Sequence, residues 1–408
     1  MRFALLGSHP DGWAMACALV EVGGHALVAY TGQAVPEHVR RRWGPSAKAV
    51  GDLEEVLADP AVEAVIVAGS PSNRPVQLRR ALQSERHVLC VHPAAADPDI
   101  GYEAALIRGD TRCVLLPLLP DALHPAVARL SEWLQGPEGP LGELRLIEME
   151  RWSPEAVLLD ADVPGHKPSL PGWDVLRRLG GEIAEVSAFA AGEELPAEEP
   201  VLLAGRFAKG GLFQVALLPR QERALCRLTI SGSRGRAQLL FPIGWPGPAF
   251  LDWRDPVGES QEEAWEVWDP WPALVKEFDR AVTSPGAPSP GPPPPAAGGG
   301  GAPGRAPPSW QDAVRCLELD DAARRSVERR RATSMEYQEA SEEVGFKGTM
   351  TLLGCGLLWL ILLLLILSYW APKVGWVILP VLALFLVLQL LRWVVPRQPR
   401  QPPGERGA

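Results

Sequence analysis

Apolar residues follow two different patterns along the chain, and the first pattern occupies its opening part. Apolar runs of strand length at residues 2–7, 25–30 and 64–68 alternate with stretches of helical composition such as residues 13–22. Continuous apolar runs that end at turn residues are typical of strands buried on both faces of a parallel sheet. The pattern predicts a Rossmann-type α/β domain over residues 1–120, and ligands of such sheets bind at the carboxyl ends of the strands.

From residue 141 to residue 268 the helical stretches give way to short apolar segments. Closely spaced segments of this kind, separated by turns, favour an antiparallel sheet. We therefore predict an α+β domain over residues 121–283 with a mostly antiparallel sheet, backed by a helix around residues 173–179. Its strands are expected near residues 183–188, 201–207, 212–217, 225–230 and 237–241, with a turn at residues 231–235.

A linker and one more helix follow the second domain. Residues 284–308 contain 17 Pro or Gly in 25 positions, and such a composition cannot bury a core. Ser309, with Asp312 three residues later, predicts a capped helix over residues 309–332.

The end of the chain carries two uncharged apolar runs. Residues 350–370 are 21 positions without a charge, enough for about 31 Å of helix at roughly 1.5 Å per residue. Residues 374–391 form a second run of 18. The runs predict two transmembrane helices, a hairpin over residues 349–395, followed by a disordered tail over residues 396–408. Basic residues flank the hairpin, so we expect a multi-pass protein in the membrane lipid bilayer, with both termini and the globular domains cytoplasmic.

Charge and cysteine spacing exclude two classes of function. The net charge is −9 and the pI is about 5.4, which disfavours a broad nucleic-acid-binding surface. Six cysteines are scattered without a CxxC pair or a Cys/His cluster, so no metal site is expected.

Four motifs of the first domain resemble those of one enzyme family. Residues 59–68, the Ser70-Pro71 pair, the Ala81-Leu82 pair and residues 87–93 together are similar to the glucose-fructose oxidoreductase and inositol dehydrogenase (Gfo/Idh/MocA) family. Residues 124–130, 142–150 and 310–326 extend the likeness into the second domain and the last helix. The resemblance implies an NAD(P)-dependent oxidoreductase that acts on a small polyol, sugar or hydroxy compound. It also implies a sheet that commonly forms an oligomer interface, so a homo-oligomer is expected.

The cofactor site implied by this likeness begins at the first turn. A dinucleotide fingerprint needs three glycines there, and Gly7 and Gly12 keep the first and third spacings. Between them lie Ser8 and His9, and His9 stands at the middle glycine, where its side chain narrows the approach of the pyrophosphate.

The other cofactor-binding residues follow later strands. The second strand should end in an acid that holds the ribose hydroxyls, but Thr31 follows it here. Residues 40–42 are all arginine. They either bind the 2′-phosphate of a cofactor or form a solvated helix face, which is the more usual case for a short charge run. Ser70, Pro71 and Asn73 form the turn after the strand at residues 64–68.

The expected catalytic residues are substituted. The family usually carries Glu-Lys-Pro after the fourth strand region, and Val91-His92-Pro93 occupies these positions. His92 is the candidate proton acceptor, because an unperturbed imidazole titrates at about 6.5. Asp174 keeps a family aspartate, while Pro171 replaces the histidine three residues before it. Two functions remain open: an oxidoreductase with a degenerate catalytic site, or a non-catalytic dinucleotide-binding sensor or scaffold, expected at the inner membrane face.

Overall fold

The computed structural model describes most of residues 1–335, and the statements below concern these residues. They are 1–32, 35–44, 47–111, 113–134, 139–154, 169–191, 194–195, 199–254, 260–283, 308–331 and 333–335.

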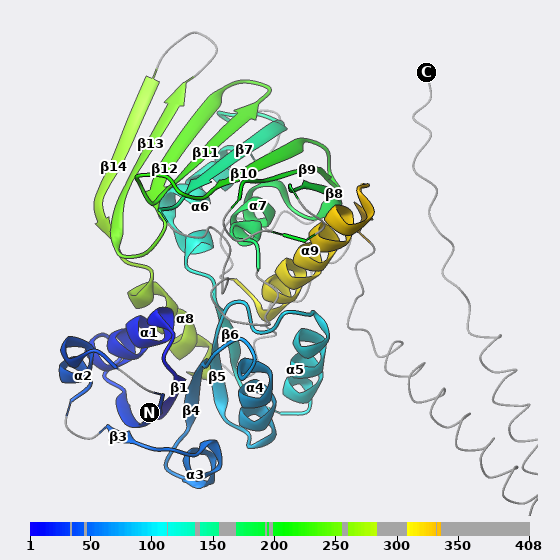
Figure 1. Cartoon of the computed structure of the whole chain (residues 1–408). Helices are drawn as coiled ribbons and strands as arrows, with labels where there is room; N and C mark the ends of the chain where they lie inside the picture. The colour runs from blue at the N-terminus through cyan, green and yellow to red at the C-terminus, as the bar shows by residue number, and fades with distance from the viewer. Residues whose placement is uncertain are drawn as a thin grey trace, which may run out of the picture. The chain divides into compact units, whose positions relative to one another are not determined.

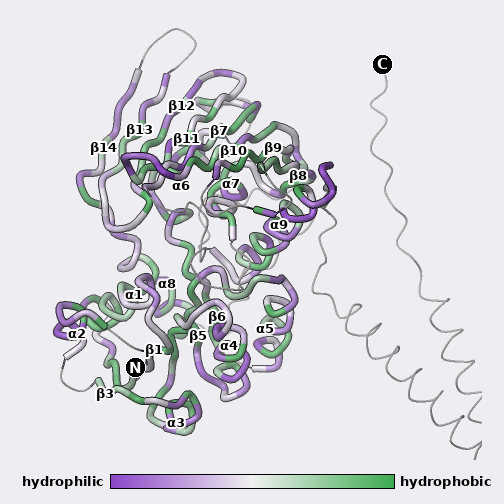
Figure 2. Tube along the Cα trace, in the orientation of Figure 1, coloured by the Kyte–Doolittle hydropathy of each residue, from purple (hydrophilic) through white to green (hydrophobic). Residues whose placement is uncertain are grey.

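The first sheet is parallel and has the strand order β3-β2-β1-β4-β5-β6 (Figure 1). Each strand except the short β3 is a run of apolar residues, and Figure 2 shows the inner strands as hydrophobic. The strands are β1 (Arg2–Gly7), β2 (Ala26–Thr31), β3 (Lys48–Ala49), β4 (Ala64–Ala68), β5 (His87–Val91) and β6 (Leu115–Leu118).

Helices cover both faces of this sheet, because successive residues of its strands point to opposite sides. Phe3 and Leu5 of β1 belong to a core with α1 and α8, whereas Ala4 and Leu6 belong to a core with α4 and α5. The helices of this domain are α1 (Pro10–Glu21), α2 (Glu37–Trp43), α3 (Leu53–Ala58), α4 (Arg74–Gln83), α5 (Asp99–Gly109) and α8 (Trp271–Thr283).

The second sheet has the strand order β14-β13-β12-β11-β7-β10-β9-β8-β15 and is antiparallel except for the pair β7 and β10. Its buried face packs on α6 (Pro125–Trp133), α7 (Trp173–Gly180) and α9 (Trp310–Arg329). Its strands are β7 (Leu144–Trp152), β8 (Ile183–Phe189), β9 (Val201–Phe207), β10 (Leu212–Leu218), β11 (Leu225–Gly232), β12 (Arg236–Pro242), β13 (Gly247–Arg254), β14 (Ser260–Trp268) and β15 (Thr333–Ser334).

Helix α9 joins the two sheets. It begins with the predicted capping box, in which Ser309 and Asp312 bond each other's backbone N–H. Farther along, the Asp320 carboxylate is 1% exposed and accepts hydrogen bonds from the Trp173 indole at 2.8 Å and from the Leu170 N–H at 3.0 Å. Burial raises the pKa of Asp320 to about 6. A buried carboxylate with these donors fixes α9 against α7.

The other face of the second sheet is open and carries several exposed apolar side chains. Leu202, Leu212 and Phe250 are 46%, 56% and 53% exposed. The homo-oligomer expected through this sheet stays a prediction.

The architecture agrees with the sequence pattern at the level of fold class. A Rossmann-type parallel sheet precedes a mostly antiparallel sheet, as predicted, and residues 233–235 of the turn predicted at 231–235 connect β11 to β12. Two features differ. Strands β13 and β14 were not predicted, and α8, within the segment assigned to the second domain, packs on α1 of the first.

The predicted membrane location requires a correction. No helix among the described residues is both long and apolar enough to cross a bilayer. Helix α9 has 20 residues, but its sequence contains charged residues in every turn, so it packs as an amphipathic helix. Residues 349–395, where the hairpin was expected, lie outside the described residues. The predicted multi-pass location with cytoplasmic domains is therefore wrong. The lipid bilayer as partner is not supported.

The end of β4 is the point on which β1 and α1 pack. A Cβ atom on Gly7, whose φ is +121°, would lie 2.2 Å from the Ala68 carbonyl oxygen. A Cβ atom on Gly12 would lie 2.4 Å from the Ala68 Cβ. Both glycines are therefore required by the close approach of backbone segments.

Gly12→Ala should lower the free energy of unfolding by about 1–3 kcal/mol, the usual cost of overpacking a core. Gly109→Ala is the matched control, since Gly109 also lies in a helix and a Cβ there meets nothing within 4 Å. The control should be neutral or slightly stabilising. Urea unfolding measures both, and equal effects of the two changes would contradict the packing role of Gly12.

Asp320 should make stability depend on pH. Its pKa is 3.8 in a model peptide and about 6 in the fold, so its protonated form is favoured by folding. The stabilisation is complete below about 4 and is lost as the pH rises through about 6. The free energy of unfolding of the wild type should fall relative to Asp320→Asn across this window, by on the order of 3 kcal/mol. Parallel curves of stability against pH for the two proteins would exclude this role.

Candidate functional site

The predicted cofactor residues lie at the carboxyl ends of β1, β2 and β4. Gly7 is paired with Ala68 across β1 and β4. The Cβ position of Gly32, which follows Thr31 at the end of β2, lies 3.0 Å from the carbonyl carbon of Gly7. The structure therefore brings the first turn and the ends of β2 and β4 together, and the role of these residues in cofactor binding stays a prediction.

His9 caps the helix that follows the first turn. Its backbone N–H donates to the Ala68 carbonyl at 3.0 Å, and its Nδ1 accepts from the Asp11 N–H at 3.2 Å. The carboxylate of Asp11 lies in the first turn of α1, 3.9 Å from Nδ1 of His9. Some of the backbone N–H groups that the N-terminus of α1 would offer to an anion are thus already bonded within the chain.

The arginines after β2 are occupied by acidic partners. Arg40 and Arg41 pair with Glu37 on the same helix, and Arg42 holds Glu21 through two hydrogen bonds of 2.6 and 2.7 Å. Glu21 is the last residue of α1, opposite the end that faces the first turn. The arrangement favours the interpretation of residues 40–42 as a solvated helix face.

A polar turn follows β4. Ser70 and Asn73 are exposed and Pro71 is buried. The Ser70 carbonyl accepts from the N–H groups of Asn73 and Arg74 at 2.8 and 2.9 Å, which starts α4.

Arg74 fixes this turn to the end of β5. Its side chain is 1% exposed, and its Nε donates to the Gly69 carbonyl at 2.9 Å. Its Nη1 donates to the carbonyl of Pro93 at 2.7 Å. His92, the candidate catalytic residue, is partly exposed between β5 and Pro93, and the peptide bond between His92 and Pro93 is cis. The Ser70 turn and His92 are therefore held by one buried side chain.

Sequence reasoning missed a charged pair that follows the neighbouring strand β6. Asp121 follows β6, which neighbours β5 with Val91 opposite Leu118. Arg151 of β7 donates from Nη1 to Asp121 Oδ2 at 3.1 Å, and the Trp245 indole donates to Oδ1 at 2.8 Å. The position of Asp121 just after an apolar run of strand length could have indicated a residue at the carboxyl end of a strand. No local sequence pattern indicates its contacts with Arg151 and Trp245, which are distant in the sequence.

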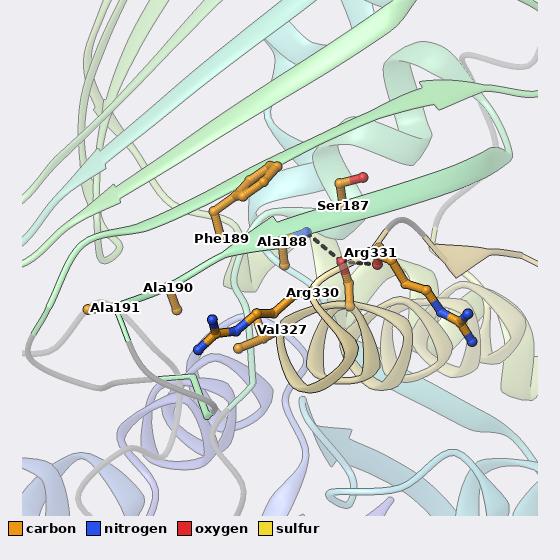
Figure 3. Close-up of a pocket in the computed structure, with 9 residues that line it drawn as sticks. Ser187, Ala188, Phe189, Ala190, Ala191, Val327, Arg330 and Arg331 are labelled. Carbon is orange, nitrogen blue, oxygen red and sulfur yellow. Dashed lines mark hydrogen bonds between the residues drawn. The ribbon is translucent and has the colours of Figure 1, made fainter.

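A cavity of about 530 Å³ lies elsewhere, between β8 and the end of α9 (Figure 3). The side chains of Arg330 and Arg331 extend to opposite sides of it, so they do not converge on one ligand. None of the predicted site residues lines it. Within the described residues, no three His, Cys, Asp or Glu side chains are placed to hold a metal ion.

Comparisons with known proteins agree with the fold and with the class of cofactor. Residues 25–109 match the Gfo/Idh/MocA profile, described as an oxidoreductase family with an NAD-binding Rossmann fold. A comparison with curated proteins found no match.

Solved structures extend the likeness to both sheets. Levoglucosan dehydrogenase, crystallised with NADH and levoglucosan, is 15% identical with a TM-score of 0.65, and the match covers 83% of this chain and 100% of that one. KijD10, a 3-ketoreductase from Actinomadura kijaniata crystallised with TDP-benzene and NADP, is 17% identical with a TM-score of 0.62, covering 79% and 96%. Residues 25–109 are thus similar to the NAD-binding Rossmann domain of the Gfo/Idh/MocA oxidoreductases, and the two-sheet chain shares the fold of these solved enzymes.

Proposed function

We propose that this protein is an NAD- or NADP-binding oxidoreductase for a small polyol, sugar or related hydroxy compound, with a substituted site that makes it slow. The observation that carries the proposal is the joint placement of Gly7, the Ser70 turn and His92 at one edge of the parallel sheet. Ligands of such sheets bind at this edge. The solved structures with NADH or NADP that share the fold support the same class of cofactor.

The residues of the first turn fit a dinucleotide in part. Gly7, Ser8 and Gly12 would flank its pyrophosphate, and Ser70, Pro71 and Asn73 would lie beside its other half. Against this, His9 Nδ1 takes the Asp11 N–H, and the Asp11 carboxylate places negative charge at the same helix end. A negative side chain near a bound phosphate is unfavourable. Thr31 offers the ribose a hydroxyl where a carboxylate would be the stronger acceptor.

His92 is the proposed proton acceptor in this site. When bound, a nicotinamide group supplies a hydride acceptor. His92 would take the proton from the substrate hydroxyl, and Arg74 would keep its backbone in place through the Pro93 carbonyl. Without the family's ammonium at this position, the developing charge on the substrate oxygen is less well stabilised.

A non-catalytic dinucleotide-binding sensor or scaffold is the second candidate. One observation favours it: two donors of the first turn are already used within the chain, the Asp11 N–H by His9 Nδ1 and the His9 N–H by the Ala68 carbonyl. Once dinucleotide binding is established, a measurement of turnover distinguishes the two candidates, because only the oxidoreductase converts a substrate.

The first prediction for this site concerns cofactor binding. The double change His9→Gly and Thr31→Asp should tighten NAD binding, because it frees the Asp11 N–H and supplies an acceptor for the ribose. The dissociation constant is measured by isothermal titration calorimetry. Glu103→Gln is the control, since Glu103 pairs with Arg79 on the surface at 2.6 Å, outside the first turn. An unchanged affinity in the double variant would mean that no nucleotide binds in this turn.

The second prediction concerns His92. Positioned general acid–base catalysis contributes typically 10²–10⁴-fold, so His92→Ala should reduce turnover by about that factor while leaving dinucleotide affinity within a few fold. His92→Lys should retain or raise turnover, because it restores an ammonium. NADH formation with a panel of polyols and sugars measures both. Undiminished turnover in His92→Ala removes the catalytic role, and binding without turnover in the wild type favours the sensor or scaffold.

A further inference from the structure

Three charged side chains from three elements meet at the end of β6. Asp121 belongs to the short 3-10 helix η1 (Asp121–Leu123), Arg151 to β7 and Asp174 to the first turn of α7. Val91 of β5 is opposite Leu118 of β6, so His92 and Asp121 follow neighbouring strand ends. Asp121 therefore follows the strand next to the one that carries the proposed catalytic residue.

Within the part of the chain that the structure describes, each carboxylate oxygen of Asp121 accepts from one side chain. Arg151 Nη1 lies 3.1 Å from Oδ2, and the Trp245 indole nitrogen lies 2.8 Å from Oδ1. The Arg151 side chain is 7% exposed, whereas that of Asp121 is 19% exposed. A carboxylate oxygen accepts two hydrogen bonds. Asp121 is thus oriented by the buried Arg151 and the partly buried Trp245, and its partly exposed carboxylate can accept further hydrogen bonds.

Trp245 is itself fixed by its neighbours. It stacks on His124 with ring centres 5.4 Å apart and on Phe241 at 5.9 Å. Burial lowers the pKa of His124 to about 4, so this imidazole is neutral and adds no positive charge near Asp121. The indole N–H that holds Asp121 is therefore part of a packed aromatic group and not of a mobile surface chain.

Asp174 holds the backbone that carries Asp121. Hydrogen bonds from the backbone of Val175 and Ala122 reach its carboxylate, and Ala122 is the residue after Asp121. Burial, and next the charge of Asp121, raise the pKa of Asp174 to about 7, with Arg151 acting in the opposite direction. The nearby thiols stay protonated, because burial raises the pKa of Cys226 to about 12 and that of Cys316 well above its usual value. The cluster thus carries one cation for two carboxyl groups.

We propose that Asp121 is a substrate-binding residue, whose carboxylate accepts hydrogen bonds from hydroxyl groups next to the carbon that is oxidised. Such a contact selects neutral vicinal polyols and cyclic sugars, because a fixed carboxylate accepts hydroxyl donors and repels carboxylate or phosphate groups. Asp174 is the positioning residue of this contact. The inference rests on the proposed function for the reaction, but the binding of polyol by Asp121 is measurable without cofactor.

The test is equilibrium binding of myo-inositol and of the anion D-glucuronate to the full chain, with and without NAD. The wild type should bind myo-inositol more tightly than D-glucuronate. Asp121→Asn should raise the dissociation constant for myo-inositol by about 10- to 100-fold, the usual range for a lost hydrogen bond to a charged group. The same change should reduce or reverse the difference in affinity by which the wild type prefers myo-inositol over D-glucuronate. Trp245→Phe, which removes the N–H donor but keeps an aromatic ring, should weaken myo-inositol binding by a smaller factor.

Glu103→Gln is the control for removing one carboxylate from an arginine pair, and it should leave both affinities unchanged. The urea midpoint shows whether each variant is folded. An unchanged affinity for myo-inositol in folded Asp121→Asn, or equal wild-type affinities for the two ligands, overturns the assignment. If the wild type binds myo-inositol as expected but does not bind NAD, the proposed oxidoreductase is overturned and the polyol contact remains. The two failures are therefore distinguishable.

Discussion

The buried guanidinium of Arg74 joins the segments that follow β4 and β5. A buried charge is tolerated only where hydrogen bonds replace its lost hydration, and the carbonyls of Gly69 and Pro93 supply two of them. These carbonyls follow β4 and β5. Because the same side chain binds both carbonyls, it ties the Ser70 turn to the segment that carries His92. Arg74 also begins α4, so the helix is tied to the same point.

The charged side chains near the carboxyl ends of the parallel strands differ from those that the family resemblance implies. No lysine stands at residue 92, and the acidic side chains of Asp11 and Asp121 lie at the first turn and beyond β6. The arginines near β2 already pair with glutamates. Under the proposed function, an anionic cofactor would depend on backbone donors and on burial of its rings, whereas a neutral hydroxyl-rich substrate would meet an acceptor in Asp121. This balance is the reason for proposing a weakly held dinucleotide and a neutral substrate.

Sequence patterns predicted the features that repeat locally and missed those that depend on distant contacts. Strands β1 and β4 are continuous apolar runs, and the Ser309 cap lies within one turn of its partner. Strand β14 was missed because it is an edge strand with mostly exposed positions, so its apolar alternation is weak. The contacts of Asp121 with Arg151 and Trp245 join positions 30 and 124 residues apart, which no local pattern encodes.

The glycines of the first turn do not by themselves indicate a bound dinucleotide. Any side chain at Gly7 or Gly12 would collide with Ala68, so the packing of β1 and α1 on β4 requires both residues whether or not a cofactor binds. A descendant that lost the cofactor would keep them for stability. His9 and Thr31 are under no such packing constraint from Ala68, and these are the positions that depart from the fingerprint. The residues that bear on function are therefore His9, Thr31 and His92, whose partly exposed side chains lie outside the core clusters.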